Sequence, residues 1–307
     1  MRRYKLNTLA KQSLVARQIP FDFATDIDHH WIPNDPELSS MINGASLTMP
    51  YLEPFLMRTI SEAKRSVGLT PELQSDIAGF VAQEGQHYQM HRKFNEHLKQ
   101  CRYPEITELE AQMDEAYKRL SKRSLRTRMA YTAGFEAMTL GVTRWLVGDR
   151  VQLFAAADSR VVSFVLWHMV EETEHKRVAH DAYVELFGSG VASYCRRAFG
   201  IFHGSLDVMR FSMKGYKMML KKDGLWSNLK SRLHLSKRLG QFIWRVFPYL
   251  LRAALPGHNP DAEKDLQWVI DWLKGYESMP SGKVPLVDTR HPLMPVPFSV
   301  NRLAEGL

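Results

Sequence analysis

Apolar residues recur at helical spacing along most of the chain, and no segment shows the alternation typical of a β-strand. This pattern predicts helices over residues 50–67, 70–100, 105–120, 124–147, 159–187, 191–255 (one or two helices) and 261–276. Residues 1–49 contain several prolines and are predicted to form an irregular arm, and residues 279–307 an extended tail. The predicted organisation is an all-α bundle over residues 50–190, with additional helices over residues 191–278 packed on it.

Two of the predicted helices place polar residues on a buried face. The helix over residues 159–187 begins with an apolar run, Val161 to Trp167, which is typical of a buried helix, and then turns polar at His168. In the helix over residues 70–100, Glu84 and His87 continue the apolar stripe. Because burying such groups is costly unless they are paired or bind a metal ion, both places are candidates for chemistry.

Both helices contain the motif Glu-x-x-His, as Glu84 with His87 and as Glu172 with His175. Residues three apart lie on one face of a helix, so each pair can bind the same metal site. A carboxylate-bridged dimetal site in a four-helix bundle of the ferritin-like type uses two such motifs and one further Glu from each of two other helices. The sequence supplies these further residues as Glu53 and Glu136, in the order Glu, Glu-x-x-His, Glu, Glu-x-x-His.

A further histidine extends the second motif. His168, Glu172 and His175 stand at positions i, i+4 and i+7, on one helix face. His168 is thus either a third imidazole ligand or a hydrogen-bonding neighbour of the site. As a ligand it resembles the extra-histidine di-iron site of the arylamine N-oxygenases. His91, seven residues beyond Glu84, is expected to be a hydrogen-bonding neighbour.

Of the residues around His175, some are expected to face the metal site and others to face solvent. Glu171 competes with Glu172 for the ligand position, but Glu172 fits its neighbours better. Glu174 is expected to point outward, and Lys176 and Arg177 are expected to be solvated charges.

Composition narrows the class of protein. The chain of 307 residues contains two cysteines, with no Cys-x-x-Cys pair, so neither a disulfide framework nor a zinc-thiolate site is predicted. The basic residues 1–13 lack the apolar core of a secretory signal, and no stretch of about 18 apolar residues occurs. A reduced, cytoplasmic location follows as the expectation.

The formal net charge of +8 is unevenly distributed, with many lysines and arginines within residues 196–255. A basic region of this kind meets an anionic membrane, a nucleic acid or an acidic substrate, or is a solvated helix face. Residues 242–252 form an amphipathic run that either lies on the inner membrane surface, packs on the bundle or forms a homodimer face. Nucleic-acid binding is not expected, because no known module for it is present.

Several motifs together resemble the bacterial family labelled "predicted metal-dependent hydrolase", which is related to the ferritin-like superfamily. The resemblance covers about residues 20–280. The residues that carry it are Trp31, residues 43–47, Pro50 with Glu53, residues 80–87, His91 with Phe94 and Asn95, and Trp167 and His168 with residues 171–176. The family's usual Pro-x-Gly-Glu is Pro50-Tyr51-Leu52-Glu53 in this sequence, which makes Glu53 a less certain ligand. The resemblance implies a metal-dependent hydrolase.

The ligand chemistry favours a different reaction from the family label. Carboxylates and imidazoles around two metal ions suit O2 activation by iron, with manganese and zinc as alternatives. The favoured hypothesis is a di-iron oxygenase or oxidase that uses O2 as co-substrate and an external electron donor to oxidise a small or lipid-like molecule. The alternatives are hydrolysis by a metal-activated water and a non-catalytic metal-binding role. A large apolar pocket beside the metal ligands would argue against the non-catalytic role.

Overall fold

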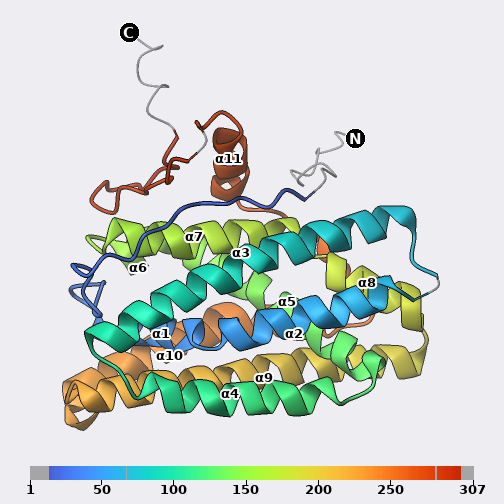
Figure 1. Cartoon of the computed structure of the whole chain (residues 1–307), viewed down its shortest axis with the longest axis horizontal. Helices are drawn as coiled ribbons and strands as arrows, with labels where there is room; N and C mark the ends of the chain where they lie inside the picture. Colours follow the sequence, from blue (N-terminus) through green and yellow to red (C-terminus); the bar gives the residue numbers. More distant parts are fainter. Residues whose placement is uncertain (1–13, 67, 281, 299–307) are drawn as a thin grey trace.

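The computed structural model describes residues 14–66, 68–280 and 282–298, and these residues contain no β-strand. The predicted all-α class is confirmed. Long helices run side by side along the molecule, while α11 and the extended segments near both ends of the chain lie on one side of it (Figure 1). The helices are α1 (Pro36–Ser46), α2 (Met49–Lys64), α3 (Pro71–Cys101), α4 (Ile106–Ser121), α5 (Leu125–Gly148), α6 (Arg150–Phe154), α7 (Ser159–Glu174), α8 (Val178–Phe187), α9 (Val191–Lys222), α10 (Leu229–Ala253) and α11 (Gln267–Tyr276), with short 3-10 turns at Leu225–Ser227 and Pro260–Ala262.

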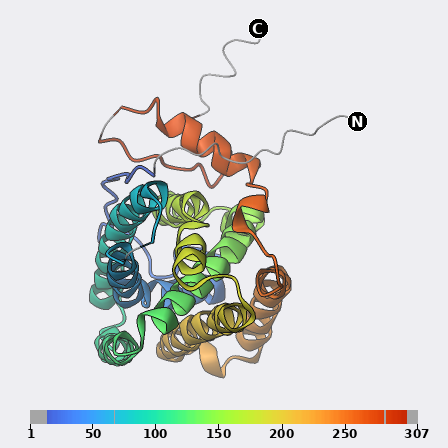
Figure 2. The ribbon, with the colours of Figure 1, turned by 90° about the vertical axis from the view of Figure 1, so that its right-hand side faces the viewer.

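The helices that carry the predicted ligands, α2, α3, α5 and α7, pack around one interior. Viewed along the molecule, α9 and α10 lie on the side away from α11 (Figure 2). None of the described helices is both long enough and apolar enough to pass through a lipid bilayer.

Capping residues in the local sequence determine where the ligand-bearing helices begin. The Thr70 hydroxyl accepts a hydrogen bond from the backbone of Leu73, and Pro71 follows at the first helical position of α3. Ser124 caps α5 in the same way, and the Asp158 carboxylate caps α7. Glu84, Glu136 and Glu172 therefore lie on helices whose starting points are set by the local sequence.

Three details differ from the sequence prediction. Residues 36–46 form α1 where an irregular arm was expected, because Asp35 caps a helix with proline in its first turn. The predicted helix over residues 159–187 is interrupted between Glu174 and Val178, so that it forms α7 and α8. The helix predicted over residues 50–67 begins one residue earlier, at Met49, so Glu53 stands just beyond its opening turn and Pro54 lies within it. The predicted end of this helix, Val67, falls outside the described residues, as do residues 1–13 and 299–307.

Glycines set how closely α9 packs. The helix is continuous through Gly204 and Gly215, and both glycines lie against neighbouring helices. The closest approach joins α9 to α5. A Cβ atom at Gly200 would lie 2.1 Å from the Ala130 carbonyl oxygen, and one at Gly134 would lie 2.2 Å from the Gly200 carbonyl oxygen. This contact sets the position of α5, two residues from Glu136.

Substitution of Gly200 by alanine should destabilise the protein, because the added methyl group meets backbone atoms that cannot move independently. Overpacking of this kind costs about 1–3 kcal/mol. Thermal unfolding followed by circular dichroism should show a lower Tm for Gly200→Ala. The matched control is Gly240→Ala, at a helical glycine with open space around it, where alanine should be neutral or stabilise by up to about 1 kcal/mol. Equal Tm values for the two variants would contradict the close-packing explanation.

Candidate metal centre

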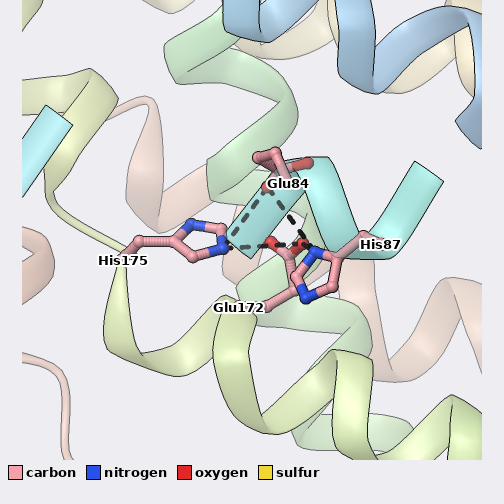
Figure 3. Close-up of side chains that lie close together, drawn as sticks. All are labelled: Glu84, His87, Glu172 and His175. Atoms are coloured by element: carbon pink, nitrogen blue, oxygen red, sulfur yellow. Dashed lines mark ion pairs between the residues drawn. The ribbon is translucent and has the colours of Figure 1, made fainter. Parts of the chain in front are cut away.

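Both Glu-x-x-His motifs meet in the interior of the bundle. Glu84, His87, Glu172 and His175 point toward one another from α3 and from the end of α7 (Figure 3). His175 Nε2 lies 3.3 Å from Glu84 Oε1 and 3.8 Å from Glu172 Oε1. His87 Nδ1 lies 3.9 Å from Glu84 Oε1 and 3.8 Å from Glu172 Oε1. All four side chains are buried, so two sequence motifs about 90 residues apart form one cluster.

A second group adjoins the first through Glu172. His168 Nε2 lies 2.8 Å from Glu172 Oε1 and 3.7 Å from Glu53 Oε1. His91 Nε2 lies 2.9 Å from His168 Nδ1, on the far side of that ring. Glu53, His91 and His168 each have a potential ligand atom within 4.8 Å of the others. The arrangement thus offers two neighbouring positions for a cation, with Glu172 between them.

Glu136 joins the cluster from α5 through His175. Its Oε2 lies 3.1 Å from His175 Nδ1, while its other carboxylate oxygen has no hydrogen-bond partner. The structure therefore brings all seven predicted ligands, Glu53, Glu84, His87, Glu136, His168, Glu172 and His175, into one buried region. Their assignment as ligands stays a prediction.

The cluster has many buried polar atoms without hydrogen bonds, which is the condition that a metal ion would relieve. Buried donors and acceptors are normally paired, because an unpaired one loses its hydration without compensation. Here the unpaired atoms belong to residues that face one another. Within the described residues, they are both carboxylate oxygens of Glu53 and of Glu84, His87 Nδ1, Glu136 Oε1, Glu172 Oε2 and His175 Nε2. The donor set, carboxylate oxygens and imidazole nitrogens, fits iron, manganese or zinc.

The pKa shifts of the buried carboxylates and of His175 also indicate a site that suits cations. Burial, followed by the negative charge of Glu172, raises the pKa values of Glu53 and Glu84 well above their ordinary range. Burial raises the pKa of Glu136 to about 7. Burial would lower the pKa of His175, but Glu172 and Glu136 outweigh it and raise that pKa to about 9. Without a cation, the cluster retains protons at neutral pH, and divalent cations would replace them.

Two residues support His87 from outside the cluster. They are Glu171, which was considered as an alternative ligand to Glu172, and Arg17, which no sequence motif indicated. Glu171 Oε2 lies 2.8 Å from His87 Nε2, so the Nδ1 atom of the same ring faces Glu84 and Glu172. The Arg17 guanidinium donates in turn to Glu171 Oε1 at 3.0 Å and also to Glu174. A carboxylate behind a ligating histidine fixes the ring orientation and raises the basicity of the nitrogen that faces the metal.

His168 has a corresponding support. The His91 ring that contacts His168 Nδ1 has its own Nδ1 atom 2.8 Å from the Ser46 hydroxyl, and Asn95 accepts a hydrogen bond from that hydroxyl. His168 Nε2 is thereby directed at Glu172 and Glu53. These contacts agree with the expectation that His91 is a hydrogen-bonding neighbour.

Three expectations about the end of α7 were wrong. Glu174 does not point outward but binds Arg17 and the side chain of Gln83. Lys176 is buried and pairs with Asp265 at 2.7 Å, and Arg177 pairs with Asp76. Because no glycine or proline marks residues 175–177, the helix break has no local signal. It coincides with long-range contacts that hold each of these side chains in place.

An apolar cavity of about 290 Å³ reaches the cluster from the side of α1, α9 and α10. Its inner end is lined by His168 and His91 together with Phe135 and Phe164. Tyr131 and Trp167 lie in the core and do not line it. The site therefore combines a buried polar cluster with an apolar chamber next to His168.

Residues 15–264 match the model of a family described as "Predicted metal-dependent hydrolase". The chain belongs to this family. No curated protein and no solved structure matches the chain. The family assignment and the buried histidine and glutamate groups agree on metal-dependent chemistry at an enzyme site.

Replacement of Glu171 by glutamine should weaken metal binding by about 10–100-fold, because His87 loses its charged support. Metal affinity is measured by competition with a chromophoric chelator. Glu174→Gln is the matched control, since Glu174 shares Arg17 but does not contact His87. An unchanged affinity for Glu171→Gln, or an equal loss in the control, would show that the contact with His87 is not what supports the metal.

Proposed function

We propose that this protein is a dimetal enzyme that uses O2 at its buried glutamate and histidine cluster to oxidise an apolar organic molecule. The observation that carries the proposal is the pairing of the cluster with an apolar cavity that ends at His168. When bound there, two iron ions would supply O2 activation. Kinship with the ferritin-like bundles is part of the same proposal.

The reaction would insert one oxygen atom into a C–H bond of the substrate and release the other as water. Two protons and two electrons are needed for this balance, and the electrons would come from an external one-electron reductant. Glu53, Glu84, His87, Glu136, Glu172 and His175 would hold the metal ions, with His168 as an additional ligand. Phe135 and Phe164 would position the substrate and exclude water at the inner end of the cavity.

Metal-dependent hydrolysis is the second candidate, and the family description favours it. A hydrolase needs a metal-activated water and groups that stabilise the oxygen atoms of a polar substrate. Among the residues that line the cavity, none is an arginine or a lysine, and the polar ones are histidines, serines, a threonine and a tyrosine. This lining suits a hydrocarbon better than an ester or a phosphate.

A purely metal-storing role is less well supported, because storage does not require a substrate chamber beside the ligands. The cellular location also belongs to the proposal: we place the enzyme in the cytoplasm.

The test is to load the anaerobically purified protein with ferrous iron and record absorption spectra as it meets O2. About two iron ions per chain, with a visible band that grows and decays, are expected. Glu136→Ala should abolish the band, because it removes the α5 carboxylate beside His175. Glu96→Ala, an exposed glutamate of α3, is the matched control and should leave the band unchanged.

Three results would decide against oxidation. They are two zinc or manganese ions per chain, no O2-dependent spectrum, and metal-dependent cleavage of ester substrates in the absence of O2. Together they would assign the site to hydrolysis. If the protein binds none of the iron, zinc and manganese ions, the dimetal interpretation itself is overturned.

A further inference from the structure

The cavity has an outer end between α9 and α10, where apolar side chains reach the surface. Met209 and Met213 of α9, one turn apart, face Leu239 and Ile243 of α10 across the cavity lining. Met213 and Ile243 are 45% and 51% exposed. The chamber beside His168 therefore connects to the molecular surface at a site bounded by apolar residues of these two helices.

The outer face of α10 continues this apolar surface in both directions. Trp244 is 78% exposed and Phe247 is 46% exposed, although both are large apolar side chains. Their spacing places them with Ile243 on one face of α10, away from the buried face that includes Tyr249 and Ala253. We call this surface the α10 stripe, and it consists of Leu229, Leu233, Ile243, Trp244, Phe247 and Leu251.

Positive charge surrounds the stripe. Residues 191–255 contain thirteen lysines and arginines, two aspartates and no glutamate, so the chain's net charge of +8 originates from this segment. The two aspartates are engaged within the fold: Asp207 accepts from the Tyr131 hydroxyl, and Asp223 accepts from Arg102 and Tyr103. The exposed cations near the cavity mouth and along α10 include Arg210, Lys217, Lys221, Lys230, Arg232 and Lys237.

We propose that the α10 stripe docks on an anionic phospholipid bilayer, and that the substrate of the dimetal site is a long-chain alkyl or acyl molecule that enters from that bilayer between α9 and α10. The substrate class rests on the function proposed above, whereas the docking rests on the surface alone. An exposed helix with aromatic and aliphatic residues on one face and lysines and arginines beside them matches an interfacial membrane helix. Anionic lipid attracts such cations.

The apolar character of the path explains why the bilayer suits this face better than an aqueous substrate pool. A hydrocarbon chain that leaves the acyl region of a membrane passes Ile243 and Met213 and then stays among apolar side chains up to His168. Most of the side chains that line the cavity are apolar, so the route suits a hydrocarbon chain. On the other side of the bundle, Arg17 covers the end of α7 through its contacts with Glu171 and Tyr276.

Membrane docking is tested by co-sedimentation of the full-length protein, as purified, with vesicles. Vesicles of phosphatidylglycerol and phosphatidylethanolamine should bind the protein about tenfold or more strongly than vesicles of phosphatidylcholine. Trp244→Glu/Phe247→Glu should reduce binding by at least about tenfold. The matched control is Leu286→Glu/Leu293→Glu, which changes two exposed leucines outside the stripe and should bind like the wild type.

Charge is tested separately. Lys230→Glu/Lys237→Glu should weaken binding to anionic vesicles and leave binding to neutral vesicles unchanged, whereas Arg92→Glu/Lys93→Glu on α3 should have no effect.

Lipids with brominated acyl chains should quench the wild-type fluorescence more than that of Trp244→Phe, because only the wild type inserts Trp244. Absence of binding, or equal binding by the wild type and the stripe variant, would overturn the docking. A dimer that the stripe variant dissociates, without vesicle binding, would show that the stripe is a self-association surface.

Occupancy of the cavity is tested with a fluorescent fatty acid. Ala45→Phe, which narrows the cavity, should reduce binding of the probe by at least about tenfold, while Ala111→Phe on the exposed face of α4 should not. Circular dichroism confirms that both variants are folded. Equal binding by the wild type and Ala45→Phe would overturn the substrate class. Because neither assay requires O2 or turnover, failure of the oxidation reaction would leave these results interpretable on their own.

Discussion

The interior of this bundle depends on the cost of removing carboxylates and imidazoles from water. A single unpaired buried carboxylate is expensive, and here Glu53, Glu84, Glu136 and Glu172 share one buried region with three histidines. Protons neutralise part of this charge, as the raised pKa of Glu84 indicates. The unpaired oxygen and nitrogen atoms would still lack partners. A structure that keeps such a cluster in its core retains a binding site for cations at the expense of stability.

The surrounding structure holds this cluster in place from several directions. Glu171 orients His87, and Arg17 neutralises Glu171 from a segment far away in sequence. His91 orients His168 from the opposite side. The close contact of α5 and α9 at Gly134 and Gly200 fixes the helix that carries Glu136. Ligand geometry is therefore a property of the whole bundle rather than of the two Glu-x-x-His motifs alone.

The sequence predicted the helices and the convergence of the ligands because both follow from local periodicity. Residues three apart share a helix face regardless of what the helix packs against, so Glu84 with His87 and Glu172 with His175 were recognisable. Arg17 was not, because a lone arginine in a segment without periodicity carries no sign of its partner. The role of Glu171 was also hidden: α7 is buried on every side, so Glu171 and Glu172 both face the interior and only the folded structure shows which partners each has. The break at His175 is held by long-range contacts to Glu136 and, through Lys176, to Asp265, which periodicity does not report.

The two candidate cation positions differ in their access to the cavity, and under the proposed function this difference would constrain where a substrate reacts. His168 lines the cavity, whereas Glu84, His87, Glu172 and His175 do not. The position near Glu53 and His168 is thus adjacent to the apolar chamber, and the position near His87 and His175 is enclosed by protein. A molecule in the chamber would therefore approach Glu172, which lies between the two positions, from the His168 side. The His168 ring lies between the chamber and the rest of the cluster, so it would influence both a metal ion beside it and the part of a bound substrate that reacts.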